Sequence, residues 1–296
     1  MIAAGSKSFR VASQLFDEPT RERAWLLYSW CRACDDITDG QTLGHGAAAP
    51  DDPAERLAFV RERTDAALAG EPTGLVPFDA LGTVAAEVDL HPALTDHHLA
   101  GFARDAAGWQ PQTEDDLLSY CYQVAGAVGV MMAQVMGVPA DDTDTLDRAS
   151  DLGLAFQLAN IARDLVDDAR VGRTYLPAEW LAEQGIAAID PDAPETPAII
   201  VAMRRRLAAM AAQYGQSARV GAARLPFRSR WAVLAAARIY GRIAEVAGAA
   251  DEAAFDTRIT VHKREKIRLV GAALRDTMRT PPAASRDGLW TRPRLD

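Results

Sequence analysis

Apolar residues recur at helical spacing through almost every long segment of this chain, and no strand-like alternation lasts beyond a few residues. This pattern predicts an all-α protein. A helix should begin at Asp17-Glu18-Pro19, because aspartate can cap a first turn and proline fits within it, and should run to about Gly40. Further helices are expected over residues 54–70, 78–90, 95–108, 114–137, 143–171, 198–221, 228–249 and 256–279.

Two loops and a tail interrupt the helical pattern. The loops run from Leu43 to Pro53 and from Asp190 to Pro197, and both are rich in proline and small residues. We expect the first loop to be mobile and to become ordered over a bound substrate. No internal repeat or long linker divides residues 1–279, which are therefore predicted to form one domain. Residues 280–296 contain Pro, Arg and Ser and are predicted to form a mobile tail.

Two acidic pairs share one spacing. Asp35 and Asp39 form the first pair, and Asp164 and Asp168 form the second. A four-residue step on a helix places both carboxylates on one face, one turn apart, where like charges repel. The arrangement costs stability unless a cation lies between the carboxylates, so each pair is a candidate metal site.

The first pair belongs to a polar stripe. At about 100° per residue, Tyr28, Arg32 and Asp39 all fall within about 60° of Asp35. Apolar side chains occupy the opposite side of the same helix. The stripe therefore places carboxylates, a guanidinium and a hydroxyl in one environment.

The second pair has a comparable stripe. Gln157, Asn160 and Asp168 fall within about 40° of Asp164, and Arg163 precedes it. The two amides lie in a stretch of helix without any charged residue, where polar groups without partners are costly. A polar cavity explains these side chains better than a solvated helix face does.

A third pair with the same spacing provides an internal comparison. Asp147 and Asp151 lie on the same predicted helix, but neither shares its stripe with an amide. Asp151 also points about 140° away from Asp164. We therefore expect this pair to be solvated and to have no role in the site.

Two acidic turns with neighbouring arginines suit a site that binds divalent cations and a diphosphate together. Mg²⁺ prefers oxygen ligands and is usually held by one or two carboxylates and substrate phosphates. Metal and arginine would stabilise charge on a departing diphosphate, and the remaining carbocation needs a dry apolar cavity. The net charge of −9 argues against nucleic acid as a partner, but not against a substrate bound through metal.

The uncharged segment from Leu117 to Ala140 is a candidate wall for such a cavity. It is long enough to span a membrane, but it contains glutamines, tyrosines and glycines and has aspartates at both ends. We interpret it as a buried core helix whose cavity side carries Tyr120, Val124, Ala125 and Val128.

Three cysteines, Cys31, Cys34 and Cys121, are too few for a disulfide framework. The Cys31-x-x-Cys34 spacing lies in an apolar helix without a second pair to complete a zinc site. These cysteines are predicted to be small core side chains in a reducing compartment. No apolar signal sequence follows the early Lys7 and Arg10, so we expect a cytoplasmic protein.

These residues fall in motifs that resemble those of the squalene and phytoene synthase family. The similarity extends from Gly5 to the region of Lys266, and its motifs are long and occur in the family's order. Within the family, the chain is most similar to bacterial phytoene synthases. The motifs are Gly5 to Phe9, Tyr28 to Asp36, Tyr120 to Gly126, Gln157 to Asp168 and Arg173 to Pro177.

The resemblance implies an isoprenoid-synthase fold, a single-domain helical bundle around a central cavity. It implies head-to-head condensation of two prenyl diphosphates through a cyclopropylcarbinyl diphosphate, with both aspartate motifs binding Mg²⁺, which Mn²⁺ could replace. In the phytoene branch, two geranylgeranyl diphosphates give phytoene through prephytoene diphosphate, in carotenoid biosynthesis. That branch ends with loss of a proton, so no NADPH is expected.

The resemblance also implies a role for each matching residue. The metal ligands would be Asp35, Asp39, Asn160, Asp164 and Asp168. The diphosphates would contact Ser6, Ser8, Tyr28, Arg32, Arg163, Arg173 and Arg258. The reacting centre would be lined by Tyr120, Gln157, Tyr175 and Tyr240, with Tyr120 and the four aspartates as the catalytic residues.

Other functions stay open. A squalene, hydroxysqualene or dehydrosqualene synthase would use farnesyl diphosphate, and the motifs do not fix the substrate's length. A class I terpene cyclase has similar metal motifs, but Ser6-Lys7-Ser8 and the arginines Arg32 and Arg163 disfavour it. A non-enzymatic assembly factor would have no reason to keep the repelling carboxylates. Besides prenyl diphosphates, a membrane surface and downstream carotenoid enzymes are candidate partners.

Overall fold

The computed structural model describes residues 7–40, 52–88 and 90–295, and no strand occurs in these ranges. The all-α prediction is therefore confirmed. Ser6, the side chain of Ser8 and nearly all of the loop expected at residues 43–53 lie outside the described part. The α-helices are α1 (Lys7–Ser13), α2 (Glu18–Thr38), α3 (Pro53–Leu68), α4 (Val76–Val88), α5 (Pro92–Ala106), α6 (Glu114–Cys121), α7 (Ala127–Val135), α8 (Thr143–Arg170), α9 (Ala178–Glu183), α10 (Thr196–Ala222), α11 (Phe227–Ala249) and α12 (Lys263–Thr277). A π-helical turn, η2 (Tyr122–Gly126), joins α6 to α7, and a 3₁₀ turn, η3 (Glu252–Ala254), follows α11.

The first long helix, α2, begins where the sequence predicts. The carboxylate of Asp17 accepts a hydrogen bond of 3.0 Å from the backbone N–H of Thr20, and this bond lowers the pKa of Asp17. The helix stops before Gly40, whose left-handed φ of +70° ends the helical pattern. Asp35 and Asp39 consequently lie at the end of α2.

Several elements differ from the predicted helices. The sequence pattern does not predict the short helices α1 and α9, and the last helix begins at Lys263 instead of residue 256. The residues before Lys263 run in an extended path, with Ile259 and Val261 buried and Thr260 exposed between them. This alternation is typical of an extended segment and anchors the loop in the core.

The uncharged segment predicted as one core helix forms α6, η2 and α7 in succession. Leu117, Val130 and Met131 are fully buried, which confirms its place in the core. A π turn takes up an extra residue and changes which side chains face each side, so helical arithmetic alone does not place residues beyond it. No helix in the described ranges is both long enough and apolar enough to cross a membrane.

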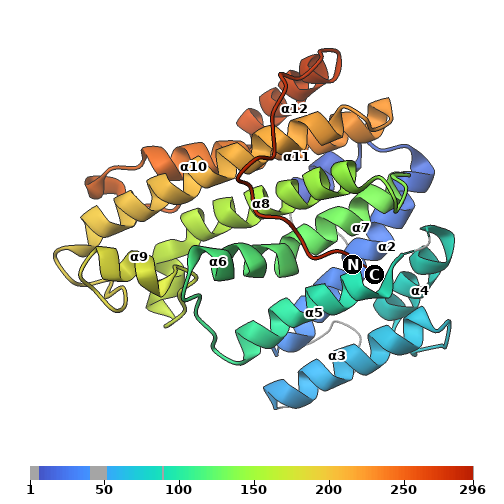
Figure 1. Ribbon diagram of the computed structural model, residues 1–296, viewed down its shortest axis with the longest axis horizontal. Coiled ribbons are helices and arrows are strands. Elements are labelled where there is room, and N and C mark those ends of the chain that lie inside the picture. The colour runs from blue at the N-terminus through green and yellow to red at the C-terminus, as the bar shows by residue number, and fades with distance from the viewer. Residues whose placement is uncertain (1–6, 41–51, 89, 296) are drawn as a thin grey trace.

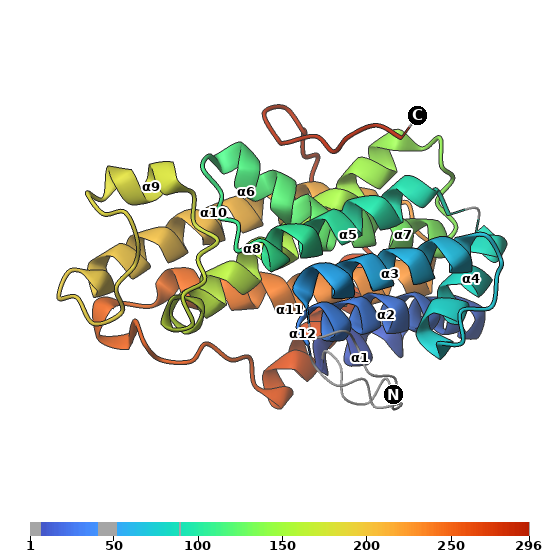
Figure 2. The ribbon, with the colours of Figure 1, turned by 90° about the horizontal axis from the view of Figure 1, so that it is seen from below.

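The described helices pack around two large apolar cores, to both of which α8 contributes, and a small third cluster lies where α10, α11 and α12 meet. One core lies where α8 meets α6, α9 and α10, and the other where α2 to α5 meet α7. Figure 1 shows α8 between α7 on one side and α10 and α11 on the other. Figure 2 shows α4 and α9 near opposite ends of the elongated bundle. The two aspartate motifs are thereby carried by two separate helices, α2 and α8.

The three cysteines are free thiols in the helical core. Cys34 and Cys121 are buried and Cys31 is half-buried. Burial raises the pKa of the Cys31 thiol to about 12, because its thiolate would be desolvated. The interpretation as core side chains is confirmed for Cys34 and Cys121, whereas Cys31 packs against the core without being fully buried.

The chain beyond α12 is anchored, which corrects two predictions. Arg286, Arg292 and Arg294 form ion pairs with Asp147 and Asp151 of α8. Residues 280–295 are therefore not a free tail, and the Asp147–Asp151 pair is not solvated. Its partners lie up to 147 residues further along the chain, which helical spacing cannot reveal.

Candidate active site

A cavity of about 550 Å³ is lined by residues of α1, α2, α5, the α6–η2–α7 segment, α8, the loop after α8, α10 and α11. Most of the lining side chains are apolar, and the volume is within the usual range of ligand pockets. Tyr120, Val124, Ala125 and Val128 all line it, as the sequence predicts for the uncharged segment.

The first acidic pair opens into this cavity. Asp35 and Asp39 line it together with Tyr28 and Arg32, so the predicted stripe does face one environment. Nη1 of Arg32 lies 2.6 Å from Oδ2 of Asp35. Burial raises the pKa of Asp35, Arg32 opposes this rise, and the negative charge of Asp39 adds to it. Ionising both carboxylates in this position therefore costs free energy, as expected of a site that binds a cation.

Only part of the second polar stripe, on α8, lines the cavity. Gln157 and Asn160 line the cavity, and Nδ2 of Asn160 donates to Oε1 of Gln157 over 3.5 Å. Asp164 and Asp168 follow along α8 outside the lining, and Nε of Arg163 donates to Asp164 over 2.7 Å. Burial and the charge of Asp164 raise the pKa of Asp168 to about 6.

A tight turn after α8 connects the second pair to the cavity. Gly172 has a φ of +73°, and the backbone N–H of Arg173 donates to the carbonyl of Asp168 over 2.9 Å. Arg173 lines the cavity, and its charge opposes the raised pKa of both Asp168 and Asp105. Arg173 is therefore a cation that borders the cavity and acts electrostatically on the second acidic pair.

Asp105 of α5 is a site residue that the sequence analysis does not identify. Its two carboxylate oxygens each lie 3.0 Å from the hydroxyl of Tyr120, which donates to them, and Tyr175 donates to Oδ1 over 3.3 Å. Burial raises the pKa of Asp105 to about 6 and that of Tyr175 to about 12. His98, Phe102 and Asp105 recur at helical spacing and all line the cavity, but the sequence alone does not indicate that this face of α5 borders a site.

Aromatic side chains line two walls of the cavity. The rings of Tyr120 and Tyr175 stack with centroids 5.1 Å apart. On another wall, Phe156 of α8 and Tyr240 of α11 stack at 4.0 Å. Tyr120, Tyr175 and Tyr240 were predicted at the reacting centre, and the structure brings all three to this one cavity.

Four predicted residues lie outside the lining. Arg163, Asp164 and Asp168 are displaced along α8, and the side chains of Arg163 and Asp164 are about a third exposed. Arg258 is exposed in the loop between η3 and α12, so the structure does not support its predicted contact with diphosphate. An ion pair of 2.6 Å between Asp256 and Arg170 fixes that loop beside the C-terminal end of α8.

The oxygen donors around the cavity fit Mg²⁺. Within residues 7–40, 52–88 and 90–295, no group of three or more His, Cys, Asp or Glu side chains forms a complete metal site. In the same ranges, Oδ1 of Asn160 is buried without a hydrogen-bond partner, an uncommon state unless a ligand satisfies it. Carboxylates, an amide oxygen and substrate phosphates are together the ligands that Mg²⁺ prefers.

Known proteins of similar sequence cover nearly the whole chain. The 15-cis-phytoene synthase of Pantoea ananas is 46% identical over 298 aligned residues, covering 99% of this chain and 96% of that protein. The 15-cis-phytoene synthase of a Paracoccus species is also 46% identical, with 99% and 95% of the two chains covered.

Solved structures of similar fold point the same way. A dehydrosqualene synthase in complex with ligand has a TM-score of 0.78 and 25% identity, with 92% of both chains covered. The squalene synthase from Alicyclobacillus acidocaldarius has a TM-score of 0.71 and 23% identity, with 82% of this chain and 88% of that chain covered, which supports the fold. The profile of the squalene/phytoene synthase family matches residues 2–265, and the chain belongs to this family.

Proposed function

We propose that this protein is a phytoene synthase of carotenoid biosynthesis, a prenyltransferase that condenses two geranylgeranyl diphosphates head to head. One diphosphate leaves as prephytoene diphosphate forms, and a second leaves as that intermediate rearranges and loses a proton to give phytoene. The observation that carries the proposal is one apolar cavity bordered by the Asp35–Asp39 pair, Asn160 and Arg173. It occurs in a chain 46% identical to a 15-cis-phytoene synthase over 99% of its length.

The polar end of the cavity would hold the diphosphates. Bound Mg²⁺, or Mn²⁺ in its place, would act as a Lewis acid toward charge on the leaving diphosphate. The residues that would hold the metal are Asp35, Asp39, Asn160, Asp164 and Asp168. Arg32, Arg163 and Arg173 would pair with diphosphate oxygens. In support, Arg32 and Arg173 line the cavity, and Arg163 pairs with Asp164 of the second motif.

The apolar part of the cavity would protect the carbocations. Water in the cavity would trap such an intermediate as an alcohol, so an apolar lining favours the hydrocarbon product. Phe156 and Tyr240 present stacked rings, which can stabilise a nearby positive charge through their faces. Asp105 holds the hydroxyls of Tyr120 and Tyr175, so their rings have fixed orientations at this site.

We expect phytoene from geranylgeranyl diphosphate and Mg²⁺ alone. The purified protein should form it without NADPH, and chelation of divalent cations by EDTA should abolish turnover, because carboxylates alone cannot bind a diphosphate. Extraction and mass spectrometry of the hydrocarbon provide the measurement.

A parallel incubation with farnesyl diphosphate tests the squalene-type alternatives. If a thirty-carbon hydrocarbon or alcohol is the preferred product, or if product forms only when NADPH is supplied, the protein is one of these squalene-type enzymes and not a phytoene synthase. Cyclised monomeric products would indicate a terpene cyclase.

The product's insolubility leads to a second proposal, that this protein is cytoplasmic and rests on a membrane. Helix α12 presents Arg264, Arg268 and Arg275 on one exposed face, together with Ile267, which is 62% exposed. The acidic residues of α12 form ion pairs with arginines of α11. Glu265 pairs with Arg242 over 2.6 Å, and Asp276 pairs with Arg238. A cationic face with an exposed apolar side chain complements an anionic lipid surface. Transfer of product to a downstream carotenoid enzyme would then take place at that surface.

We expect wild-type protein to sediment with vesicles that contain about one-third phosphatidylglycerol and to stay free with phosphatidylcholine alone. Changing Arg264, Arg268 and Arg275 to Glu should weaken this binding at least ~tenfold, since each basic residue contributes about 1 kcal/mol near such a surface. Arg61, Arg205 and Arg219 are exposed on other helices, so their triple change to Glu is a control of equal charge. Equal loss in both variants would contradict a specific role for α12.

A further inference from the structure

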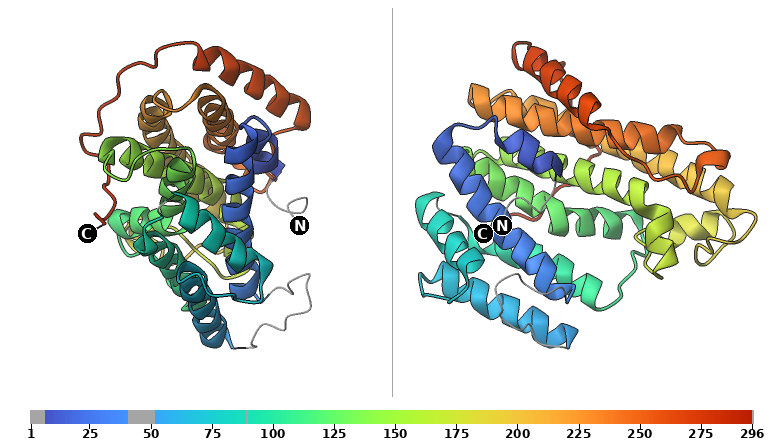
Figure 3. Two further views of the ribbon diagram at one scale, coloured as in Figure 1. Left: turned by 90° about the vertical axis from the view of Figure 1, so that its right-hand side faces the viewer. Right: turned by 180° about the vertical axis from the view of Figure 1, so that it is seen from behind.

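The segment from Ala284 to Leu295, here called the C-terminal strap, follows α12 along the outside of the bundle. Figure 3 shows the chain leaving α12 and running down the side of the molecule away from α1 and α2. The strap ends beside α8, with Leu289 and Trp290 packed against one apolar core and Leu295 against the other. It is therefore part of the folded structure, although it contains no helix.

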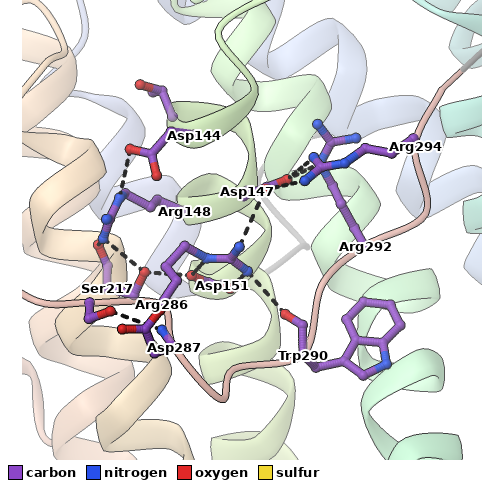
Figure 4. Close-up of polar contacts among 12 residues, drawn as sticks. Asp144, Asp147, Arg148, Asp151, Ser217, Arg286, Asp287, Trp290, Arg292 and Arg294 are labelled. Atoms are coloured by element: carbon purple, nitrogen blue, oxygen red, sulfur yellow. Dashed lines mark hydrogen bonds and ion pairs between the residues drawn. The ribbon is translucent and has the colours of Figure 1, made fainter.

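The strap is bound by two buried carboxylates of α8. Asp147 is 4% exposed and Asp151 is 1% exposed. Nε and Nη2 of Arg286 donate to the two oxygens of Asp151 over 2.8 and 2.9 Å, as Figure 4 shows. Asp147 lies 2.9 Å from Nε of Arg292 and accepts from both terminal nitrogens of Arg294 over 2.9 and 3.1 Å. Buried carboxylates are stable only with such partners, so these contacts fix the strap's position.

One side chain of α8 connects the strap directly to the cavity. Arg148 lines the cavity, and its Nη1 donates to the carbonyl of Ala284 over 3.2 Å and to Oγ of Ser217 over 3.2 Å. Ser217 in turn donates to Asp151. The strap, α10 and a cavity-lining arginine therefore share one hydrogen-bonded network.

A second connection runs through the π turn η2. The ring of Trp290 lies 5.5 Å from that of Tyr122, the first residue of the turn. The Tyr122 hydroxyl lies 2.7 Å from Nδ1 of His97, so this ring is held from two sides. A π turn is less favourable than an α-helix and persists where its surroundings hold it. Val124 and Ala125 of this turn line the cavity.

The π turn also lies directly against α8. A Cβ atom on Gly153 would come within 2.3 Å of the carbonyl oxygen of Ala125 and 2.6 Å of Cα of Gly126. The two backbones are thus in contact, and only glycine permits this approach. A displacement of the turn or of α8 would be transmitted to the other and would change the cavity wall.

We infer that the C-terminal strap is a positioning element for the reaction. Trp290 and the ion pairs of Arg286 and Arg292 with Asp147 and Asp151 hold the π turn against α8 from outside, and this fixes the wall formed by Val124 and Ala125. The effect on turnover rests on the proposed function, whereas the effect on the π turn does not. Asp147, Asp151, Arg286 and Trp290 are positioning residues, because they act on the wall and not on the substrate.

Trp290→Ala tests the inference without leaving a buried charge unpaired. We expect backbone amides of residues 122–130 to exchange hydrogen at least tenfold faster than in wild type, while residues 78–88 of α4 are unchanged. With geranylgeranyl diphosphate, kcat should fall about tenfold with KM within twofold, and more prephytoene diphosphate should escape. Trp290→Phe keeps a ring against Tyr122. It should therefore recover most of the wild-type protection from exchange and most of the wild-type kcat.

Arg294→Gln is the matched control, since this side chain is 52% exposed and Asp147 keeps two other arginines. It should stay within twofold of wild type in exchange and turnover. Unchanged exchange of residues 122–130 in Trp290→Ala would overturn the inference, whether or not phytoene is the product. If Trp290→Ala does not fold, Trp290→Phe decides: wild-type exchange with tenfold lower kcat would also contradict the inference.

Discussion

Asp35→Asn and Asp164→Asn should each lower kcat by at least ~10²-fold while the protein remains folded. Asparagine keeps the shape of aspartate but removes the charge that would bind a divalent cation. Folding should not suffer, because each change relieves repulsion within its pair and burial already raises the pKa of Asp35. Circular dichroism establishes the fold, and steady-state phytoene formation measures the loss.

Asp167→Asn is the appropriate control for these variants. Asp167 lies on the same helix as Asp164, its side chain is 67% exposed, and its nearest cation is 4.0 Å away at Arg170. We expect near wild-type turnover. Asp151→Asn cannot serve as this control, because Asp151 is buried and binds Arg286. Wild-type rates in Asp35→Asn or Asp164→Asn would refute the metal sites.

The parts of the site that depend on one helix could be predicted from spacing. Tyr28, Arg32 and Asp39 share the cavity with Asp35 because residues three, four and seven apart on a helix share a face. The same rule placed Gln157 and Asn160 on the cavity wall. It needs only a correct helix assignment, and the apolar pattern supplied one.

The parts that depend on packing between distant segments could not be predicted. The Asp147–Asp151 pair has the same local pattern as the site pairs, but its cations come from a strap 135 or more residues later. Charge and spacing alone therefore led to the prediction that this pair is solvated. The arginines of the strap lie in a segment whose composition is typical of a mobile polar tail, so the sequence did not identify them as its partners. Asp105 was missed for a related reason, since Tyr120 and Tyr175 approach it from two other segments.

Asp105→Asn should lower kcat on the order of 10²-fold and yet make the protein more stable at pH 8. The carboxylate accepts hydrogen bonds from Tyr120 and Tyr175, and an asparagine amide offers one acceptor oxygen where the carboxylate offers two. The two rings would lose their fixed orientation. Stability should increase because an ionised carboxyl that is mostly buried is replaced by a neutral group.

The pH dependence of unfolding separates this explanation from a general packing effect. Burial raises the pKa of Asp105 from 3.8 to about 6 in the folded protein, so protonation favours the fold. The stabilisation is fully present below pH 3.8 and is lost as pH rises through about 6, and at pH 8 the ionised group costs up to roughly 3 kcal/mol. Asp105→Asn should therefore have the higher midpoint of thermal unfolding at pH 8, with the advantage shrinking by pH 5. A variant less stable than wild type by the same amount at both pH values would show that Asp105 serves only the packing of α5, and its assignment to the active site would fail.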